Sequence, residues 1–181
     1  AEPEYAAGRA PSLPIELTCI DGGVHPWATF SSYNHRVIEN EHGIFIAYNR
    51  SETSIEPRQH DTWRLIRSRD RGRHFEVLYE EHNGYISPVL DDDAAGNLFL
   101  MFPNYDNASA WFYRFDAAKR FRDPLEREVP GGCFGRVGGK FTLLHDKIRD
   151  RLYYWPKDRK FFVLTPSGDT LSSRTLFADG P

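Results

Sequence analysis

The chain has 181 residues, enough for one domain with a sizeable core, and a formal net charge of -3. It contains no basic block and no apolar run near the ~20 residues of a membrane helix, so we expect neither a nucleic-acid partner nor a membrane partner. Aromatic residues make up 14% of the chain, and 14 Gly and 12 Pro supply frequent turns. This composition favours an all-β fold of short strands.

The beginning of the chain predicts a tail followed by a strand. Residues 1–14 are rich in Pro and Ala, and we expect them to be flexible. Such a start without Met fits a mature end left by signal-peptide removal, and equally an engineered or processed start; we expect a secreted or periplasmic protein. Residues 15–20 alternate apolar and polar side chains, which predicts a half-buried strand.

Cys19 and Cys133 are the only two cysteines. In an oxidising compartment they could pair, but sequence separation alone does not place two cysteines within bonding distance. The more common alternative is that both are buried as small hydrophobic residues.

From residue 30 onward, a unit of about 50 residues recurs. Each unit runs as strand, acidic or Gly-containing turn, aromatic strand, loop and hairpin, and the expected units cover residues 30–81, 82–132 and 133–181. The predicted strands cover residues 34–39, 44–48, 62–67, 75–80, 86–90, 98–102, 110–115, 126–129, 140–144, 152–155, 160–164 and 170–177. Four strands at this spacing are typical of a β-propeller blade.

Three blades do not close a ring, because propellers have typically about four to eight. We therefore expect residues 15–181 to form a partial propeller, the N-terminal portion of a larger ring. Its remainder would be a C-terminal part or a second chain, and residues 15–20 would complete another blade. The structural alternative is a small complete β-sandwich.

Residues 68–75 match the pattern Ser-x-Asp-x-Gly-x-x-aromatic between two predicted strands. We expect Asp70 to accept hydrogen bonds from N–H groups of its own turn, and Gly72 to adopt a positive φ. The Ser68 hydroxyl can tie the strand to the turn, and Phe75 can pack the hairpin onto the sheet. The run resembles the Asp box, or BNR repeat, of sialidase-like β-propellers; the alternative is an ordinary polar hairpin.

A wider resemblance involves residues 33–38 and 42–48, which look like the first blade of secreted bacterial BNR-type propellers. Some members of that group are lyases of acidic polysaccharides such as ulvan. The resemblance implies a carbohydrate-active protein without a cofactor, either a lyase or a hydrolase of acidic polysaccharide. The alternative is a non-catalytic propeller that binds a glycan or a protein. The Phe-Arg-Ile-Pro motif of true sialidases is absent, which counts against that activity.

In propellers the ligand site usually lies at one end of the central channel, in loops that precede the innermost strand or follow the second strand. In this chain these loops are residues 32–36, 82–85, 133–136, 48–50, 104–107 and 155–157. They are rich in His, Tyr, Asn and Arg, the groups from which glycan sites are built, although any single one could be an ordinary solvated loop residue.

A lyase needs a base, a partner for the uronate carboxylate and an acid for the leaving oxygen. The predicted catalytic residues are His35 as base and Tyr85 or Tyr105 as acid. The predicted substrate-binding residues are Asn34, Arg50, His82 and Arg136; Asn34 could fix the His35 tautomer, and Arg50 or Arg136 would pair with the carboxylate. No His-x-His or Cys-rich spacing supports a metal site.

Overall fold

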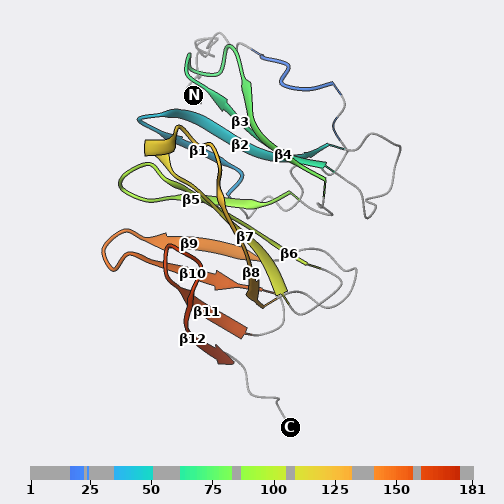
Figure 1. Cartoon of the computed structure of the whole chain (residues 1–181). Coiled ribbons are helices and arrows are strands. Elements are labelled where there is room, and N and C mark those ends of the chain that lie inside the picture. Colours follow the sequence, from blue (N-terminus) through green and yellow to red (C-terminus); the bar gives the residue numbers. More distant parts are fainter. Residues whose placement is uncertain are drawn as a thin grey trace, which may run out of the picture.

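The computed structural model of the chain describes residues 17–22, 24, 35–50, 62–82, 87–104, 109–131, 141–156 and 160–175. Within these ranges the all-β prediction is confirmed, since the strands form three four-stranded antiparallel sheets. No helix in the described part of the chain is long and apolar enough to cross a membrane. Figure 1 shows the three sheets stacked in chain order.

Each sheet is a meander in which consecutive strands are neighbours. The first sheet contains β1 (Val37–Asn40), β2 (Gly43–Arg50), β3 (Thr62–Ser68) and β4 (Glu76–Glu81). The second contains β5 (Val89–Asp92), β6 (Leu98–Pro103), β7 (Ser109–Phe115) and β8 (Leu125–Pro130). The third contains β9 (Thr142–Asp146), β10 (Arg151–Trp155), β11 (Lys160–Leu164) and β12 (Thr170–Thr175). A short 3-10 helix, η1 (Ala117–Lys119), lies between β7 and β8.

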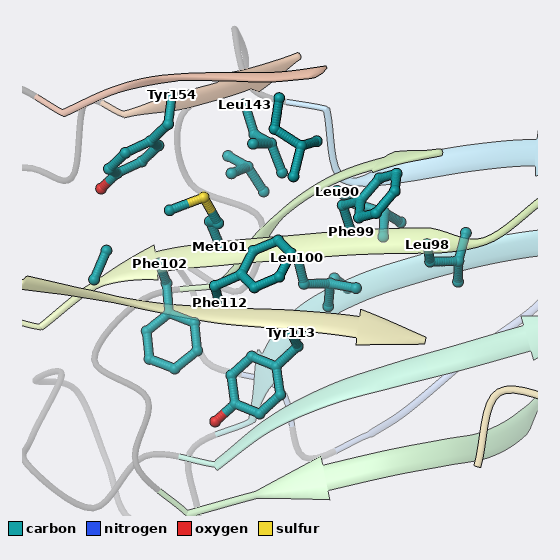
Figure 2. Packing of buried hydrophobic residues seen from close by; sticks show 14 of the residues in the cluster. Leu90, Leu98, Phe99, Leu100, Met101, Phe102, Phe112, Tyr113, Leu143 and Tyr154 are labelled. Atoms are coloured by element: carbon teal, nitrogen blue, oxygen red, sulfur yellow. The ribbon is translucent and has the colours of Figure 1, made fainter. Parts of the chain in front are cut away.

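The middle sheet is covered on both faces, which explains its long apolar runs. On one face, Phe102 and Tyr113 contact the Trp63 ring of the first sheet, with centroid distances of 5.9 and 5.1 Å. On the other face, Phe99 contacts the His145 ring of the third sheet at 5.0 Å. Figure 2 shows the two sets of side chains leaving β6 and β7 in opposite directions, with Tyr154 above Met101. The core is therefore two aromatic layers, one on each side of this sheet.

The first strands of the three sheets, β1, β5 and β9, contact one another in that order. Near the start of β1, the His35 carbonyl accepts from the Leu90 N–H at 2.9 Å, and the Arg36 guanidinium donates to the Ser87 carbonyl. At the far end of β1, the Asn40 amide donates to the Asp92 carboxylate at 3.1 Å. The start of β1 therefore lies beside the start of β5, and the two strands also end beside each other, so β1 and β5 run in the same direction.

The same junction continues to the third sheet. Asp92, which is 8% exposed, also accepts from the Lys147 ammonium at 2.8 Å, and Asp91 accepts from the His145 N–H at 2.6 Å. The buried Asp92 carboxylate at the end of β5 thus joins Asn40, the last residue of β1, to Lys147, which follows β9.

The turns after the first strands repeat one hydrogen-bond pattern. Asn40, Asp93 and Asp146 are evenly spaced along the chain, and each side chain accepts from the N–H two residues later. This Asx turn is a local preference of Asn and Asp that ends a strand and starts a hairpin. The repeat inferred from the sequence is therefore present in the structure at the level of single hydrogen bonds.

The turn after β3 has the hydrogen bonds predicted for Ser68 and Asp70 and the positive φ predicted for Gly72. The Asp70 carboxylate accepts from the His74 N–H at 2.9 Å, and the fully buried Ser68 hydroxyl accepts from the Gly72 N–H at 2.8 Å. The hydroxyl also donates to Asp70 at 2.8 Å, and Gly72 has φ +86°. These hydrogen bonds lower the pKa of Asp70, and the largest contribution comes from the His74 N–H.

Two expectations for the N-terminal part are wrong where the structure describes it. Residues 17–20 lie outside any strand and are exposed, and no strand among the described residues pairs with them. Cys19 is exposed and free, rather than buried. Cys133 and residues 1–16 lie outside the described residues. The segment instead contacts the first sheet further on, where Val24 forms an isolated bridge with Arg50.

Candidate functional site

Two of the predicted site residues, His35 and Arg50, lie at the same end of the first sheet. Val37, the first residue of β1, pairs with Ile46 of β2, and the Arg36 carbonyl accepts from the Ala47 N–H at 3.0 Å. The antiparallel register therefore brings His35, which is exposed, next to Tyr48 near the end of β2. Arg50 ends the same strand two residues later.

A polar cluster surrounds this position and is centred on Asp21. The Asp21 carboxylate accepts from the Tyr48 hydroxyl at 2.9 Å and from the Arg64 guanidinium at 2.9 Å. The Arg50 guanidinium lies 3.7 Å from the same carboxylate. The Asp21 side chain is only 11% exposed, whereas that of Arg50 is 31% exposed. Asp21 thus anchors the N-terminal segment, and Arg50 remains the more accessible cation.

The strand register produces this cluster. Tyr48 of β2 pairs with Arg64 of β3, and Arg64 pairs with Glu80 of β4. The Arg64 guanidinium bridges the two sides, because it also forms an ion pair with Glu80. Opposite charges directly across neighbouring strands stabilise a sheet.

The electrostatics keep the phenol of Tyr48 protonated. Burial raises the pKa of Tyr48, and its hydrogen bond with Asp21 acts in the same direction, against the opposing hydrogen bond with Arg64. Tyr48 is 4% exposed. Its hydroxyl is therefore a fixed donor to Asp21 and holds that carboxylate in place between Tyr48 and Arg64.

His82 lies at the same end of the sheet but on another strand. It follows β4 directly, and its Nδ1 is 2.8 Å from the Thr62 hydroxyl at the start of β3. Two strands separate β4 from β1, which places His82 roughly 14 Å from the β1 register position of His35 at a strand spacing of ~4.8 Å. A ligand that contacts both histidines must span the end of the sheet.

The other predicted site residues, Asn34, Tyr85, Tyr105 and Arg136, lie outside the described residues. In the described part, no group of three or more His, Cys, Asp or Glu side chains is arranged to hold a metal ion. The described cluster consists of the Asp21 carboxylate, the buried phenol of Tyr48 and the guanidinium groups of Arg50 and Arg64, and exposed His35 lies at the register position opposite Tyr48. Such a set can take up a proton and bind a carboxylate.

The sequence analysis did not single out Asp21, Arg64 or Glu80. The positions of Arg64 and Glu80 could have been found from the predicted strands, since Arg64 lies on β3 opposite Tyr48 of β2, and Glu80 lies on β4 opposite Arg64. Asp21 could not, because its contact with Tyr48 depends on how the segment before β1 folds back onto the sheet.

Comparison of this chain with protein families, with curated proteins and with solved structures finds no match. The geometry described above is therefore the basis for the functional argument.

Proposed function

We propose that the three sheets are successive blades of a β-propeller related to the sialidase-like type. Two observations support this. The first strands of the sheets run side by side, as the innermost strands of blades do, and the turn after β3 has the hydrogen bonds expected of an Asp box. The ring would be completed by further blades, either from the same protein or from a second chain.

We further propose that this is a carbohydrate-active protein that acts on acidic polysaccharides, in a secreted or periplasmic setting. The observation that carries the proposal is that exposed His35 and Arg50 lie at the same end of the first sheet, with Arg50 two residues beyond Tyr48, the β2 residue opposite His35. That edge of the sheet would face the channel mouth of a propeller. Arg50 would pair with a uronate carboxylate, because a guanidinium binds carboxylates with two parallel hydrogen bonds.

The reaction that fits these groups best is β-elimination. Neutral His35 removes the proton from the carbon next to the carboxylate, and Arg50 stabilises the charge that develops on the carboxylate. A carbon–carbon double bond forms as the bond to the glycosidic oxygen breaks, and Tyr85 or Tyr105 donates a proton to that oxygen. Hydrolysis of the same substrates is the other enzymatic form of the proposal.

A non-catalytic propeller that binds a glycan or protein is the second candidate. One observation favours it: the polar groups around Asp21 are mutually engaged, and Tyr48 is buried. Under this hypothesis the cluster is structural, and Arg50 and His82 make only binding contacts.

The test measures ultraviolet absorbance of unsaturated product with a panel of uronate-containing polysaccharides. The lyase proposal predicts turnover that His35→Ala lowers by ~100-fold or more with little loss of substrate binding. His74→Ala is the matched control, because His74 is 89% exposed in the turn after β3, at the other end of the sheet. If the protein binds a polysaccharide but gives unsaturated product with none of the panel, the result favours the non-catalytic candidate. Turnover that survives His35→Ala would exclude His35 as the base.

A further inference from the structure

A second polar site lies at the opposite end of the first sheet, between that sheet and the middle one. It is a cavity of about 520 Å³ lined by Glu41, His42, Arg67, Arg69, Ala117, Arg120 and Phe121. Glu41 and His42 form the β1–β2 turn. Arg67 is the last residue but one of β3, and Arg69 follows that strand. The other three belong to η1 and the residues after it. We call this the arginine cavity.

The wall of the arginine cavity is rigid. Phe121 is 1% exposed, and its ring packs against Phe45 at 4.9 Å and against the His42 ring at 5.6 Å. The Arg67 guanidinium lies over the same ring, 5.3 Å from its centroid. Phe121 has φ +62°, so its position is set by an uncommon backbone conformation as well as by packing. The cavity therefore exists before any ligand arrives.

The arginines of the cavity differ in how they are engaged. Arg67 has a side chain only 6% exposed, and its Nε and Nη2 both donate to Glu76, at 2.8 and 2.5 Å. Arg69 is 63% exposed and has a looser contact with the same carboxylate, at 3.4 Å. Among the described residues, no hydrogen bond or ion pair is recorded for the exposed guanidinium of Arg120. Arg67 thus shapes the site, while Arg69 and Arg120 are available to a ligand.

Positive charge exceeds negative charge around the cavity. Glu76, which does not line the cavity, is shared between Arg67 and Arg69. Glu41, the acidic residue of the lining, is 73% exposed and lies 3.6 Å from the His42 Nε2. The hairpin that supplies Arg67 and Arg69 also places Arg71 and Arg73 at the following alternate positions, both exposed. Asp70, the acidic residue among them, is engaged by its own turn.

We propose that the arginine cavity binds an oxyanion, that is, a carboxylate, sulfate or phosphate group of a ligand, through Arg69 and Arg120. The planar guanidinium matches such groups with paired hydrogen bonds, and two of them on facing elements can hold one anion from two sides. The site lies at the other end of the sheet from His35 and Arg50. It is thus separate from the proposed polysaccharide site, and either can exist without the other.

The experiment is a titration of isotope-labelled protein with sulfate, phosphate and glucuronate, each at constant ionic strength, followed by amide chemical shifts. We expect saturable shifts of His42, Arg69, Arg120 and Phe121 with at least one probe, and the strongest probe identifies the chemistry of the group. Arg120→Gln should weaken that binding by about tenfold, as expected for loss of a charge-assisted hydrogen-bond pair.

Arg122→Gln is the matched control, since Arg122 is an exposed arginine two residues away that does not line the cavity. It should leave the affinity within about twofold, whereas Glu41→Gln should tighten binding because it removes a lining negative charge. The proposal is overturned if no probe gives saturable shifts at these residues. Equal effects of Arg120→Gln and Arg122→Gln would also overturn it, because they would indicate attraction to net charge rather than to a built site.

Discussion

Single hydroxyl groups organise the turns that close two of the sheets. Ser68 accepts from the N–H groups of Asp70 and Gly72, two and four residues later, at 3.4 and 2.8 Å. Thr165, at the corresponding place after β11, accepts from the N–H groups of Ser167 and Asp169 at 3.3 and 3.0 Å. The hydroxyl is therefore the shared part of the turn, and it also donates to a carboxylate in both cases, that of Asp70 in the first sheet and that of Asp169 in the third.

We expect Ser68→Ala to lower the free energy of unfolding by ~1–3 kcal/mol, because it removes a buried hydroxyl and leaves two N–H groups of the turn without their acceptor. Urea unfolding measures the change. Ser172→Ala is the control, since Ser172 is an exposed serine on β12 and its loss should cost under about 0.5 kcal/mol. Equal stability of the two variants would contradict a structural role for the Ser68 hydroxyl.

The Asp70 carboxylate should make the stability of the folded protein depend on pH in the acidic range. Its pKa in the folded protein is below the ordinary 3.8, chiefly because of the His74 N–H and ring. A carboxyl with a lowered folded pKa stabilises the protein fully above its unfolded pKa, and this contribution is lost as the pH falls through the folded value. Asp70→Asn should therefore melt below the original protein at neutral pH, and the gap should shrink below about pH 4.

Thermal melts across that range measure the gap. Asp123→Asn, which changes an exposed carboxylate on the β7–β8 connection, controls for the general loss of one negative charge. A gap for Asp70→Asn that stays constant down to about pH 2 would show that the carboxylate charge contributes nothing to the turn.

At the scale of elements, the Asp92 carboxylate links the first strands of the three sheets, β1, β5 and β9. Asp92 at the end of β5 receives Asn40 from the first sheet and Lys147 from the third. The hydrogen bond with Asp92 raises the pKa of Lys147, so the lysine stays charged throughout the physiological range. The sheets are thus connected by polar contacts at their inner ends as well as by the aromatic layers between their faces.

Asp92→Ala should reduce stability by ~1–3 kcal/mol, because it leaves the Asn40 amide and Lys147 without their shared acceptor. Lys147→Met should cost under about 1 kcal/mol, since the Lys147 side chain is 50% exposed and its ion pair is screened by water. Urea unfolding of both variants gives the comparison. A larger loss for Lys147→Met than for Asp92→Ala would contradict the central role of the carboxylate.

The strands were predictable because their signals are local. The residues of β6 form a continuous apolar run, which is typical of a strand covered on both faces. Residues 68–75 include Ser, Asp and Gly at the positions where a turn needs them. The segment at 17–20 alternates like a strand but pairs with no strand edge in the described part of the chain, and alternation alone does not reveal that. The contacts of Asp21 with Arg64 and of Arg67 with Phe121 join distant parts of the chain, so the sequence did not predict either site cluster.

At the scale of the whole molecule, the third sheet presents an apolar face away from the core. Leu144 is 53% and Trp155 40% exposed, and the Tyr153 and Phe161 rings stack on the same sheet at 5.6 Å. The middle sheet is a precedent for how such a face is covered, because the first sheet packs on one of its faces and the third sheet on the other. The free face of the third sheet should therefore bind a further sheet of this kind.

For the isolated chain, that further sheet would belong to a second copy. Sedimentation velocity should show a species that grows with protein concentration, and the double variant Leu144→Gln, Trp155→Gln should remain monomeric without a lower melting temperature. Val77→Gln, which changes a 53% exposed residue on the first sheet, is the control. A concentration-independent monomer of the unmodified chain would show that the face needs no partner.

The side-by-side arrangement of β1, β5 and β9 is the basis of the proposed channel mouth. Nuclear Overhauser contacts between amide protons of these neighbouring strands test that arrangement most directly. In uniformly labelled protein, we expect contacts from Leu90 to residues 35–36 and from His145 to Asp91, which join β1 to β5 and β5 to β9. Contacts that place β4 beside β5 in one continuous sheet, with none between β1 and β5, would contradict the arrangement of first strands and with it the proposed channel mouth.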